Sequence, residues 1–499
     1  MTQRDNQSRP FKVLGIVNND ISSDTRVKRV AASAAISGFE SIVLGFSNSS
    51  KVEHAKMGDV QIIKVPVPLE YGRGKFSKKS QFKKLVLFLL SPGFMAPIKE
   101  LVKRFYQLFK KGYLKRSVKW ILTSAIKLLL KVISTVPQAK SKLQATKASR
   151  SAVSAIRRVT LRDFELHYGK EILELKPDLI HAHDFHMIGV AVEAARKLRI
   201  SGHEVKVIYD AHELVEGLDH LDASVQEYWL NYESQYIHEV DGIMCVSGQQ
   251  AERLQIRYQL SEMPTVILNC PILDRGVGLI NTIRDDLGID NEILVYHGKA
   301  SVARGLEVFV ESLKFLDESA HIALIVNLED PFINDLKELA LKVARSRTGA
   351  FERLHFLPYV PAEDLPEYLS TADIAVIPLL PTGNHEVAMP NKLFEAIQAK
   401  LPVLSSERRA LTEFINRNGI GLVYVDNDPS ELAAAANTML KNLEHYKQAL
   451  SSDFSEKYSW GVQSEELIKT YCQLLDLEII SPLAISHGDI VIQGLQVPL

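Results

Sequence analysis

The chain has 499 residues, of which 46% are apolar and 24% charged, and it contains three cysteines. This composition is that of a folded globular protein and excludes collagen-like, disordered and disulfide-scaffold classes. At roughly 150 residues per domain, the length predicts two to four domains. The odd, widely spaced cysteines, the polar residues 1–10 and the lack of an 18-residue uncharged apolar run lead us to expect a cytoplasmic protein.

The net charge of −1 hides a strong segregation of charge. Residues 71–160 contain 22 Lys and Arg but a single acid, Glu100. Within them, residues 101–109 and 122–133 repeat apolar side chains at helical spacing, which predicts cationic amphipathic helices. We expect this segment to bind an anionic membrane surface, peripherally on the inner face of the cell membrane. The alternative is a solvated insertion packed on the protein, and no recognisable module indicates nucleic acid.

Short apolar runs rich in β-branched residues mark the expected strands of the first half. Because they are predominantly apolar rather than alternating, they indicate strands covered on both faces of a parallel sheet. In chain order these runs are residues 12–17, 40–46, 61–66, 178–183, 205–210 and 242–246.

The strand pattern restarts in the second half. Residues 269–291 are rich in Asp, Asn, Pro and Gly without a sustained period, which predicts a linker. A second series of expected strands follows it, at residues 293–297, 322–327, 354–358, 374–378, 402–405 and 421–425. The fold class is therefore α/β, with two Rossmann-like doubly wound domains facing a central cleft.

Polar residues cluster where two of the first-half strands end. His181, His183 and Asp184 close one strand, and His212 and Glu213 follow the next. The carboxyl ends of parallel strands open into the ligand crevice of such sheets. Three interpretations remain open: a metal cluster, an acid/base or sugar-binding wall, and histidines satisfied by local hydrogen bonds. We expect no metal, because the spacing matches no known ligand set.

A basic loop follows the first strand of the second half. Gly298, Lys299, Arg304 and Gly305 lie between this strand and the next expected helix. Glycines allow close backbone approach, and the cations beside a helix N-terminus suit a diphosphate. Basic loop residues are also common without any ligand, and neither GxGxxG nor a P-loop motif occurs in the chain.

A third constellation surrounds Pro390, which suits the first turn of a helix. Asn391 and Lys392 would then lie at the positive end of that helix, with Glu395 one turn further on. A buried carboxylate needs partners, and the paired hydroxyls of a ribose would satisfy it. The alternative is an ordinary amphipathic helix with Glu395 in solvent.

Taken in order, these motifs resemble those of the family-four glycosyltransferases, retaining enzymes of the GT-B fold. The matching segments are residues 181–184, 210–213, 241–247, 298–305, 371–373, 390–395 and 458–460. The resemblance spans nearly the whole chain apart from the basic insertion, the linker and the last twenty or so residues. It implies an acceptor-side domain 1–268 carrying the 71–160 insertion, a linker 269–291, a nucleotide-sugar domain 292–455, a helix 456–478 crossing back, and a tail 479–499.

The resemblance also implies roles on the donor side. Lys299 and Arg304 match the basic pair that binds the donor diphosphate, in the reverse of the commonest order, with Gly298 beside them. Glu395 matches the glutamate that holds the nucleotide ribose. His212 matches the histidine near the donor sugar and the reacting centre, so His212, Lys299 and Arg304 are the expected catalytic residues.

On the acceptor side, the resemblance implies His183 and Asp184, with Asp24 and Arg26 in the first loop as weaker candidates. His183 and Asp184 close an expected strand, and Asp24 and Arg26 lie in the loop that follows the first expected strand.

The chain departs from the family pattern at one position. Val387 stands where the family commonly has a second glutamate, with Glu386 one residue away. We expect the donor sugar to be held differently, through Glu386, Asn391 and Lys392.

The implied function is transfer from a nucleotide-diphosphate sugar, UDP- or GDP-linked, to a glycan or lipid-linked glycan in cell-envelope polysaccharide synthesis. No metal or other cofactor is expected, because cations and a helix N-terminus meet the leaving-group charge. The alternative is a non-catalytic GT-B protein that binds a nucleotide or glycan in an assembly complex, and Val387 is the residue that favours it.

Overall fold

The computed structural model describes residues 9–67, 147–219, 221–273, 281–425, 427–479, 486 and 488–493. The predicted cationic helices at residues 101–109 and 122–133 lie outside these ranges. The chain divides into two compact units, residues 68–163 and the remainder, and the description below concerns the remainder.

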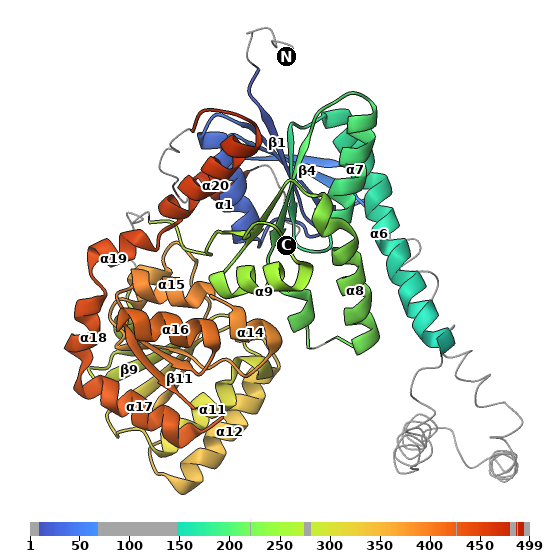
Figure 1. Ribbon diagram of the computed structural model, residues 1–499. Helices are drawn as coiled ribbons and strands as arrows, with labels where there is room; N and C mark the ends of the chain where they lie inside the picture. The colour runs from blue at the N-terminus through green and yellow to red at the C-terminus, as the bar shows by residue number, and fades with distance from the viewer. Residues whose placement is uncertain are drawn as a thin grey trace, which may run out of the picture. The chain divides into compact units, whose positions relative to one another are not determined.

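Nine strands of the described residues form the first sheet, in the order β15-β3-β4-β2-β1-β5-β6-β7-β8 (Figure 1). They are β1 (Lys12–Ile16), β2 (Glu40–Ser47), β3 (Glu53–Met57), β4 (Val60–Pro66), β5 (Leu179–His183), β6 (Lys206–Ala211), β7 (Gly242–Cys245), β8 (Thr265–Val266) and β15 (Ile492–Gln493). The six strands predicted for the first half are confirmed. The sequence prediction missed β3, an antiparallel strand whose burial alternates, because a half-exposed strand has no continuous apolar run.

The helices of this half are α1 (Thr25–Ile36), α6 (Lys147–Leu175), α7 (Ile188–Ile200), α8 (Ala223–Tyr236) and α9 (Gly248–Tyr258), with short 3-10 turns η1 (Val215–Gly217) and η2 (Ile237–Glu239). Asp24 caps α1, because its carboxylate accepts the backbone N–H of Val27. The buried face of α1, including Val27 and Val30, packs into the core of the first sheet.

The second sheet has six strands among the described residues, all parallel, in the order β11-β10-β9-β12-β13-β14. They are β9 (Glu292–His297), β10 (Ala320–Ile325), β11 (Leu354–Leu357), β12 (Ile374–Ile377), β13 (Val403–Ser406) and β14 (Gly421–Tyr424). This is the doubly wound order of a Rossmann sheet. The second series of predicted strands and the predicted fold class are therefore confirmed.

The helices of the second half are α10 (Ile283–Leu287), α11 (Leu306–Glu311), α12 (Phe332–Ser346), α13 (Leu365–Leu369), α14 (Gly383–Val387), α15 (Asn391–Gln398), α16 (Arg409–Asn418), α17 (Pro429–Lys441), α18 (Leu443–Ala449) and α19 (Ser452–Lys457), with 3-10 turns η3 (Val302–Arg304) and η4 (Ser312–Lys314). The short helix α10 lies inside the predicted linker, where Thr282 and Asp285 form a capping box.

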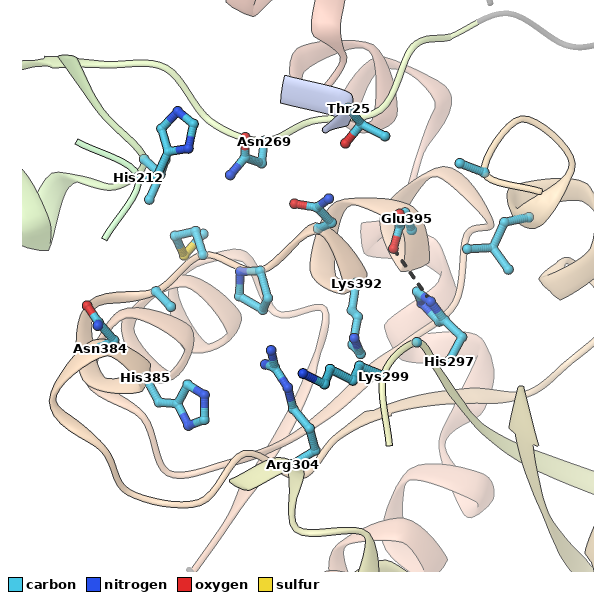
Figure 2. A pocket seen from close by; sticks show the side chains of 18 of the residues that line it. Thr25, His212, Asn269, His297, Lys299, Arg304, Asn384, His385, Lys392 and Glu395 are labelled. Carbon is cyan, nitrogen blue, oxygen red and sulfur yellow. Dashed lines mark ion pairs between the residues drawn. The ribbon is translucent and has the colours of Figure 1, made fainter. Parts of the chain in front are cut away.

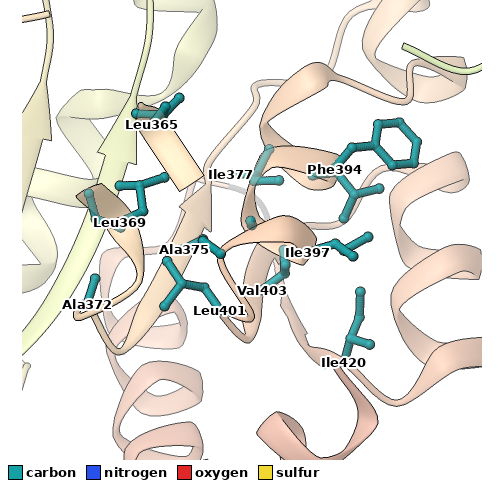
Figure 3. Packing of buried hydrophobic residues seen from close by; sticks show 14 of the residues in the cluster. Leu365, Leu369, Ala372, Ala375, Ile377, Phe394, Ile397, Leu401, Val403 and Ile420 are labelled. Atoms are coloured by element: carbon teal, nitrogen blue, oxygen red, sulfur yellow. The ribbon is translucent and has the colours of Figure 1, made fainter. Parts of the chain in front are cut away.

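Both faces of the second sheet are buried. Along β9, Ile293 and Val295 face one apolar cluster, whereas Leu294 and Tyr296 face another, as the two-residue period of a strand requires. Figure 3 shows the first cluster, in which Phe394 of α15 packs near strands β12 and β13. This packing fixes the helix that carries the candidate donor residues.

The C-terminal helix α20 (Trp460–Leu474) packs beside α1 in the core of the first sheet (Figure 1). Trp460 is fully buried there, and its indole N–H donates to Ser33 Oγ at 2.9 Å. The guanidinium carbon of Arg29 lies 4.9 Å from the centroid of the indole ring. The chain thus returns to the first sheet after completing the second.

Within the part of the chain that the structure describes, no helix combines the length and apolar character needed to cross a membrane.

Candidate functional site

A cavity of about 680 Å³ lies at the carboxyl ends of strands from both sheets (Figure 2). Residues that follow β6 and β7 line it from the first half, and residues that follow β9 line it from the second half. Helices α14 and α15 also contribute to its lining. Open α/β sheets bind their ligands at this edge.

Cations from two elements converge in this cavity. Lys299 and Arg304 come from the loop between β9 and α11, and Lys392 comes from the first turn of α15. Figure 2 shows their side chains directed toward a shared space. Burial and the neighbouring Arg304 lower the pKa of Lys392 to about 8. Positive charge gathered this way is suited to a dianionic or polyanionic ligand.

Gly298 allows Lys392 to approach. The Lys392 ammonium lies over the Tyr296 ring, 5.1 Å from its centroid. A Cβ atom on Gly298 would stand 2.5 Å from Lys392 Nζ, and the φ of Gly298 is +108°. A side chain at this position would therefore strain the backbone and displace the ammonium.

Glu395 lies beside these cations, one turn further along α15. Burial raises the pKa of Glu395, while Lys392 and Arg29 oppose that shift. The nearest imidazole is that of His297, with Nδ1 3.6 Å from Glu395 Oε2 (Figure 2). Burial and Lys392 hold the pKa of His297 well below its ordinary value, so the contact joins a neutral ring to the carboxylate. Glu395 thus keeps acceptor capacity for hydroxyl groups of a ligand.

The opposite wall carries His212, Thr25 and Asn269 (Figure 2). Asn269 begins the predicted linker, and its Oδ1 accepts a hydrogen bond from Arg26 at 2.9 Å. With the oxygen occupied in this way, the amide nitrogen remains as its donor. Thr25, Asn269 and His297 were not among the predicted site residues, although His297 ends a predicted strand directly before Gly298.

An apolar stretch borders the cavity between α14 and α15. Val387, Ala388 and Met389 all line it, and Ser247 Oγ donates to the Val387 carbonyl at 2.5 Å. The position at which the family commonly has a glutamate thus presents an apolar side chain to the ligand space.

Of the predicted site residues, the structure brings seven together as lining of this cavity: His212, Gly298, Lys299, Arg304, Asn391, Lys392 and Glu395. It does not place Asp24, Arg26, His183, Asp184 or Glu386 among them.

Those five residues have other partners. Arg26 and His183 are buried beneath His212, with exposed fractions of 5% and 1%. Asp24 caps α1, and Asp184 accepts the backbone N–H of Phe185 at 2.7 Å. Glu386 pairs with Arg408.

A cluster of metal-ligating groups lies beneath the cavity among the described residues. One ligand atom each from His181, His183 and Asp210 lie within 4.8 Å of one another. Both Asp210 carboxylate oxygens already accept hydrogen bonds from the Arg26 guanidinium, at 2.7 and 2.8 Å. A second cation at this carboxylate would face direct repulsion from Arg26.

Two family models match the chain. The model described as Glycosyltransferase Family 4 matches residues 157–274, and the model described as Glycosyl transferases group 1 matches residues 291–442.

The chain is also similar to two curated proteins over part of their lengths. It is 32% identical to amylovoran biosynthesis glycosyltransferase AmsK of Erwinia amylovora over 98 residues, which are 19% of this chain and 24% of AmsK. It is 24% identical to D-inositol 3-phosphate glycosyltransferase of Geodermatophilus obscurus over 258 residues, which are 48% of this chain and 54% of that protein. The chain therefore matches about a quarter and about half of these relatives.

Solved structures resemble the chain over most of its length. Sucrose-phosphate synthase from Thermosynechococcus elongatus has a TM-score of 0.60 at 15% identity, covering 93% of this chain and 99% of that one. Anabaena HepE in complex with UDP and glucose has a TM-score of 0.56 at 13% identity, covering 93% and 100%. At such identities the likeness shows the fold, which is GT-B. Together, the two family matches and the fold support a GT-B glycosyltransferase of the family-four type.

Proposed function

We propose that the chain transfers a sugar from a nucleotide-diphosphate sugar, UDP- or GDP-linked, to a hydroxyl of a glycan or lipid-linked glycan. The observation that carries this proposal is the convergence of Lys299, Arg304 and Lys392 in one cavity with Glu395 beside them. The cations match the charge of a diphosphate, and the carboxylate can accept two ribose hydroxyls.

The same geometry supports catalysis without a metal ion. Charge develops on the diphosphate as the bond to the sugar breaks, and donors fixed in advance around that charge lower the barrier. Lys299 and Arg304 would stabilise the departing diphosphate, and the N-terminus of α15 contributes a positive dipole end at Asn391 and Lys392. We infer retention, with the acceptor hydroxyl entering from the face on which the diphosphate departs.

The relatives favour a role in polysaccharide synthesis and a uridine nucleotide. AmsK is described as an amylovoran biosynthesis glycosyltransferase, and the similar structure of HepE contains bound UDP and glucose. Since these matches are partial or distant, the acceptor and the base of the donor are proposals for this chain.

A screen for turnover tests the proposal. The purified chain is incubated with UDP-, GDP- and ADP-sugars, and release of free nucleoside diphosphate is measured with and without glycan acceptors, alongside thermal shifts with each nucleotide. Release that depends on one donor supports the transferase. Stabilisation by a nucleotide without release supports the non-catalytic alternative that Val387 favours. If no nucleotide stabilised the protein and no nucleoside diphosphate were released, the transferase and the non-catalytic alternative would both be contradicted.

Gly298→Ala provides a first prediction about the donor site. We expect the affinity for a nucleoside diphosphate to fall about tenfold or more. The new methyl group would displace the Lys392 ammonium from its place beside Lys299 and Arg304, where the diphosphate would bind. Titration calorimetry measures this change. Gly349→Ala is the matched control, since Gly349 also has a positive φ, +79°, but nothing within 4 Å of its Cβ position. Equal losses in the two variants would show that backbone strain alone is responsible.

We further propose that residues 71–160 hold the enzyme on the anionic inner face of the cell membrane, where a lipid-linked acceptor would be found. Replacing Lys103, Arg104, Lys110 and Lys111 with Gln should weaken cosedimentation with phosphatidylserine vesicles while leaving nucleotide binding unchanged. Each cation near such a surface contributes about 1 kcal/mol. Unchanged vesicle binding would return the segment to the solvated-insertion interpretation.

A further inference from the structure

A buried carboxylate lies directly beneath His212. Asp210 is the penultimate residue of β6 and has no exposed surface, and the Arg26 guanidinium donates to both of its carboxylate oxygens, at 2.7 and 2.8 Å. Two further hydrogen bonds hold the Arg26 guanidinium in place. Its Nη1 donates to the Ile267 carbonyl at 2.8 Å and to Asn269 Oδ1 at 2.9 Å. Asp210 is thus held in place from α1 and from the segment after β8.

Three imidazoles lie around Oδ2, one of the two carboxylate oxygens that Arg26 also contacts. Asp210 Oδ2 lies 3.3 Å from His181 Nε2, 3.4 Å from His183 Nδ1 and 3.4 Å from His212 Nε2. The hydroxyl of Tyr471 in α20 lies 2.6 Å from His181 Nδ1. His181 and His183 stack with ring centroids 4.2 Å apart. The cluster therefore links the C-terminal helix to the wall of the cavity.

The ionisable groups of this cluster differ in their protonation states at neutral pH. Burial opposes ionisation of Asp210, but Arg26 and the imidazoles outweigh it and hold the pKa of Asp210 well below its ordinary value. Burial lowers the pKa of His181, and burial together with His181 lowers that of His183 to about 3. Both buried rings are therefore neutral around neutral pH.

His212 behaves in the opposite way. Burial and Arg26 would lower its pKa, but the charge and hydrogen bond of Asp210, with a smaller contribution from Asp184, raise it. The His212 side chain keeps 20% of its surface exposed and lines the cavity. Among the described residues, no hydrogen bond reaches its Nδ1.

We infer that Asp210 is a positioning residue for His212: the carboxylate retains the hydrogen on His212 Nε2, so that Nδ1 faces the cavity as the nitrogen that bonds a hydroxyl of the bound sugar. His212 Nε2 lies 3.4 Å from Asp210 Oδ2 and 3.3 Å from His183 Nδ1. A lone pair on Nε2 would face the carboxylate oxygen, which is unfavourable, whereas an N–H there is attracted to the carboxylate and can also donate to the His183 lone pair. This inference rests on the proposed function only for what occupies the cavity.

The competing explanation gives Asp210 a purely structural task, the neutralisation of Arg26. That task is fulfilled by the two bonds to the guanidinium and needs no particular tautomer of His212. The two explanations therefore differ in the protonation of His212, which can be measured without substrate.

The first test uses the wild-type chain. Ring-¹⁵N NMR, with the His212 signals assigned by loss in His212→Asn, reports the tautomer and the titration of this imidazole. We expect the neutral ring to carry its hydrogen on Nε2 and to titrate above the ordinary value of about 6.5. An Nδ1–H tautomer, or titration at or below that value, would overturn the inference even if the protein turns over no nucleotide sugar.

The second test removes the carboxylate charge. Asp210→Asn leaves a buried guanidinium unpaired, so the double variant Arg26→Gln/Asp210→Asn is measured beside it. In both, the titration of His212 should move to lower pH, and kcat should fall about ten- to a hundredfold while nucleoside diphosphate affinity stays within about threefold.

Glu233→Gln is the control for altering a buried carboxyl group away from His212, and it is measured above pH 7 because burial raises the pKa of Glu233 to about 7. Glu233 accepts hydrogen bonds from Tyr209 and Tyr258, each at 2.5 Å, and within the described ranges it forms no hydrogen bond or ion pair with an imidazole. Its replacement should leave the His212 titration in place. A His212 titration unchanged in both Asp210 variants would show that the carboxylate serves Arg26 alone.

Discussion

Replacing Lys299 and Arg304 together with alanine should lower kcat/KM for the nucleotide-sugar donor by at least about a thousandfold. Each side chain supplies a charge-assisted contact to the diphosphate as negative charge develops, and removal of one such donor commonly costs about a hundred- to a thousandfold in rate. The two losses should not add fully, because Lys392 remains beside both positions. Initial rates of nucleoside diphosphate release measure the effect.

Two further variants sharpen this result. Lys342→Ala removes one positive charge from the exposed side of α12 and should leave the rate unchanged. Arg304→Lys keeps the charge but loses the planar fork of donors, so it should retain part of the activity. A folded Lys299→Ala/Arg304→Ala protein with the wild-type kcat/KM would contradict the donor assignment.

Trp460→Ala should cause the largest loss of stability, about 3–5 kcal/mol. The indole ring is fully buried in the core of the first sheet, and its removal leaves a cavity there. The change also orphans the Ser33 hydroxyl and uncovers the buried Arg29 guanidinium, which lies over the ring. Urea unfolding followed by circular dichroism measures the shift of the transition.

Trp460→Phe separates the contribution of the aromatic ring from that of the hydrogen bond to Ser33. It retains an aromatic ring over Arg29 but cannot donate to Ser33 Oγ, so we expect an intermediate loss. If Trp460→Ala cost less than about 1 kcal/mol, α20 would not be an integral part of the first sheet's core.

Most of the fold could be predicted from the sequence because a strand buried on both faces is apolar throughout. Residues 293–297 and 374–378, for example, are short and mostly apolar, which suits either a buried strand or a buried helix segment. Their short length favours a strand. The antiparallel strand β3 escaped this criterion, since its sequence Glu53–Met57 is mostly polar and alternates in burial. The pairing of β15 with β3 was equally inaccessible, because residues 492–493 carry no strand signal of their own.

The donor side of the site was predictable to the extent that glycines and cations occur together in sequence. Gly298 and Lys299 are adjacent, and Lys392 and Glu395 share one helix face, so local spacing places them. Asn269 could not be found in this way, because it reaches the cavity from an irregular segment and is oriented by Arg26, which is 243 residues distant in sequence.

The acceptor side shows where sequence reasoning ends. His181 and His183 lie two residues apart on β5 and therefore share a face of the strand, where their rings stack. What covers that face is Tyr471 of the C-terminal helix, about 290 residues later, so these histidines are buried. Glu386 similarly meets Arg408, a partner that no local pattern predicts.

The central claim is that Lys299, Arg304 and Lys392 form a site for a nucleoside diphosphate. Calorimetric titration of the full chain with a nucleoside diphosphate and with the corresponding monophosphate tests it most directly. We predict at least about tenfold tighter binding of the diphosphate, equivalent to about 1.4 kcal/mol, and loss of this difference when the three cations are replaced by alanine. Equal affinity for both nucleotides, or a difference that survives the triple replacement, would contradict the claim.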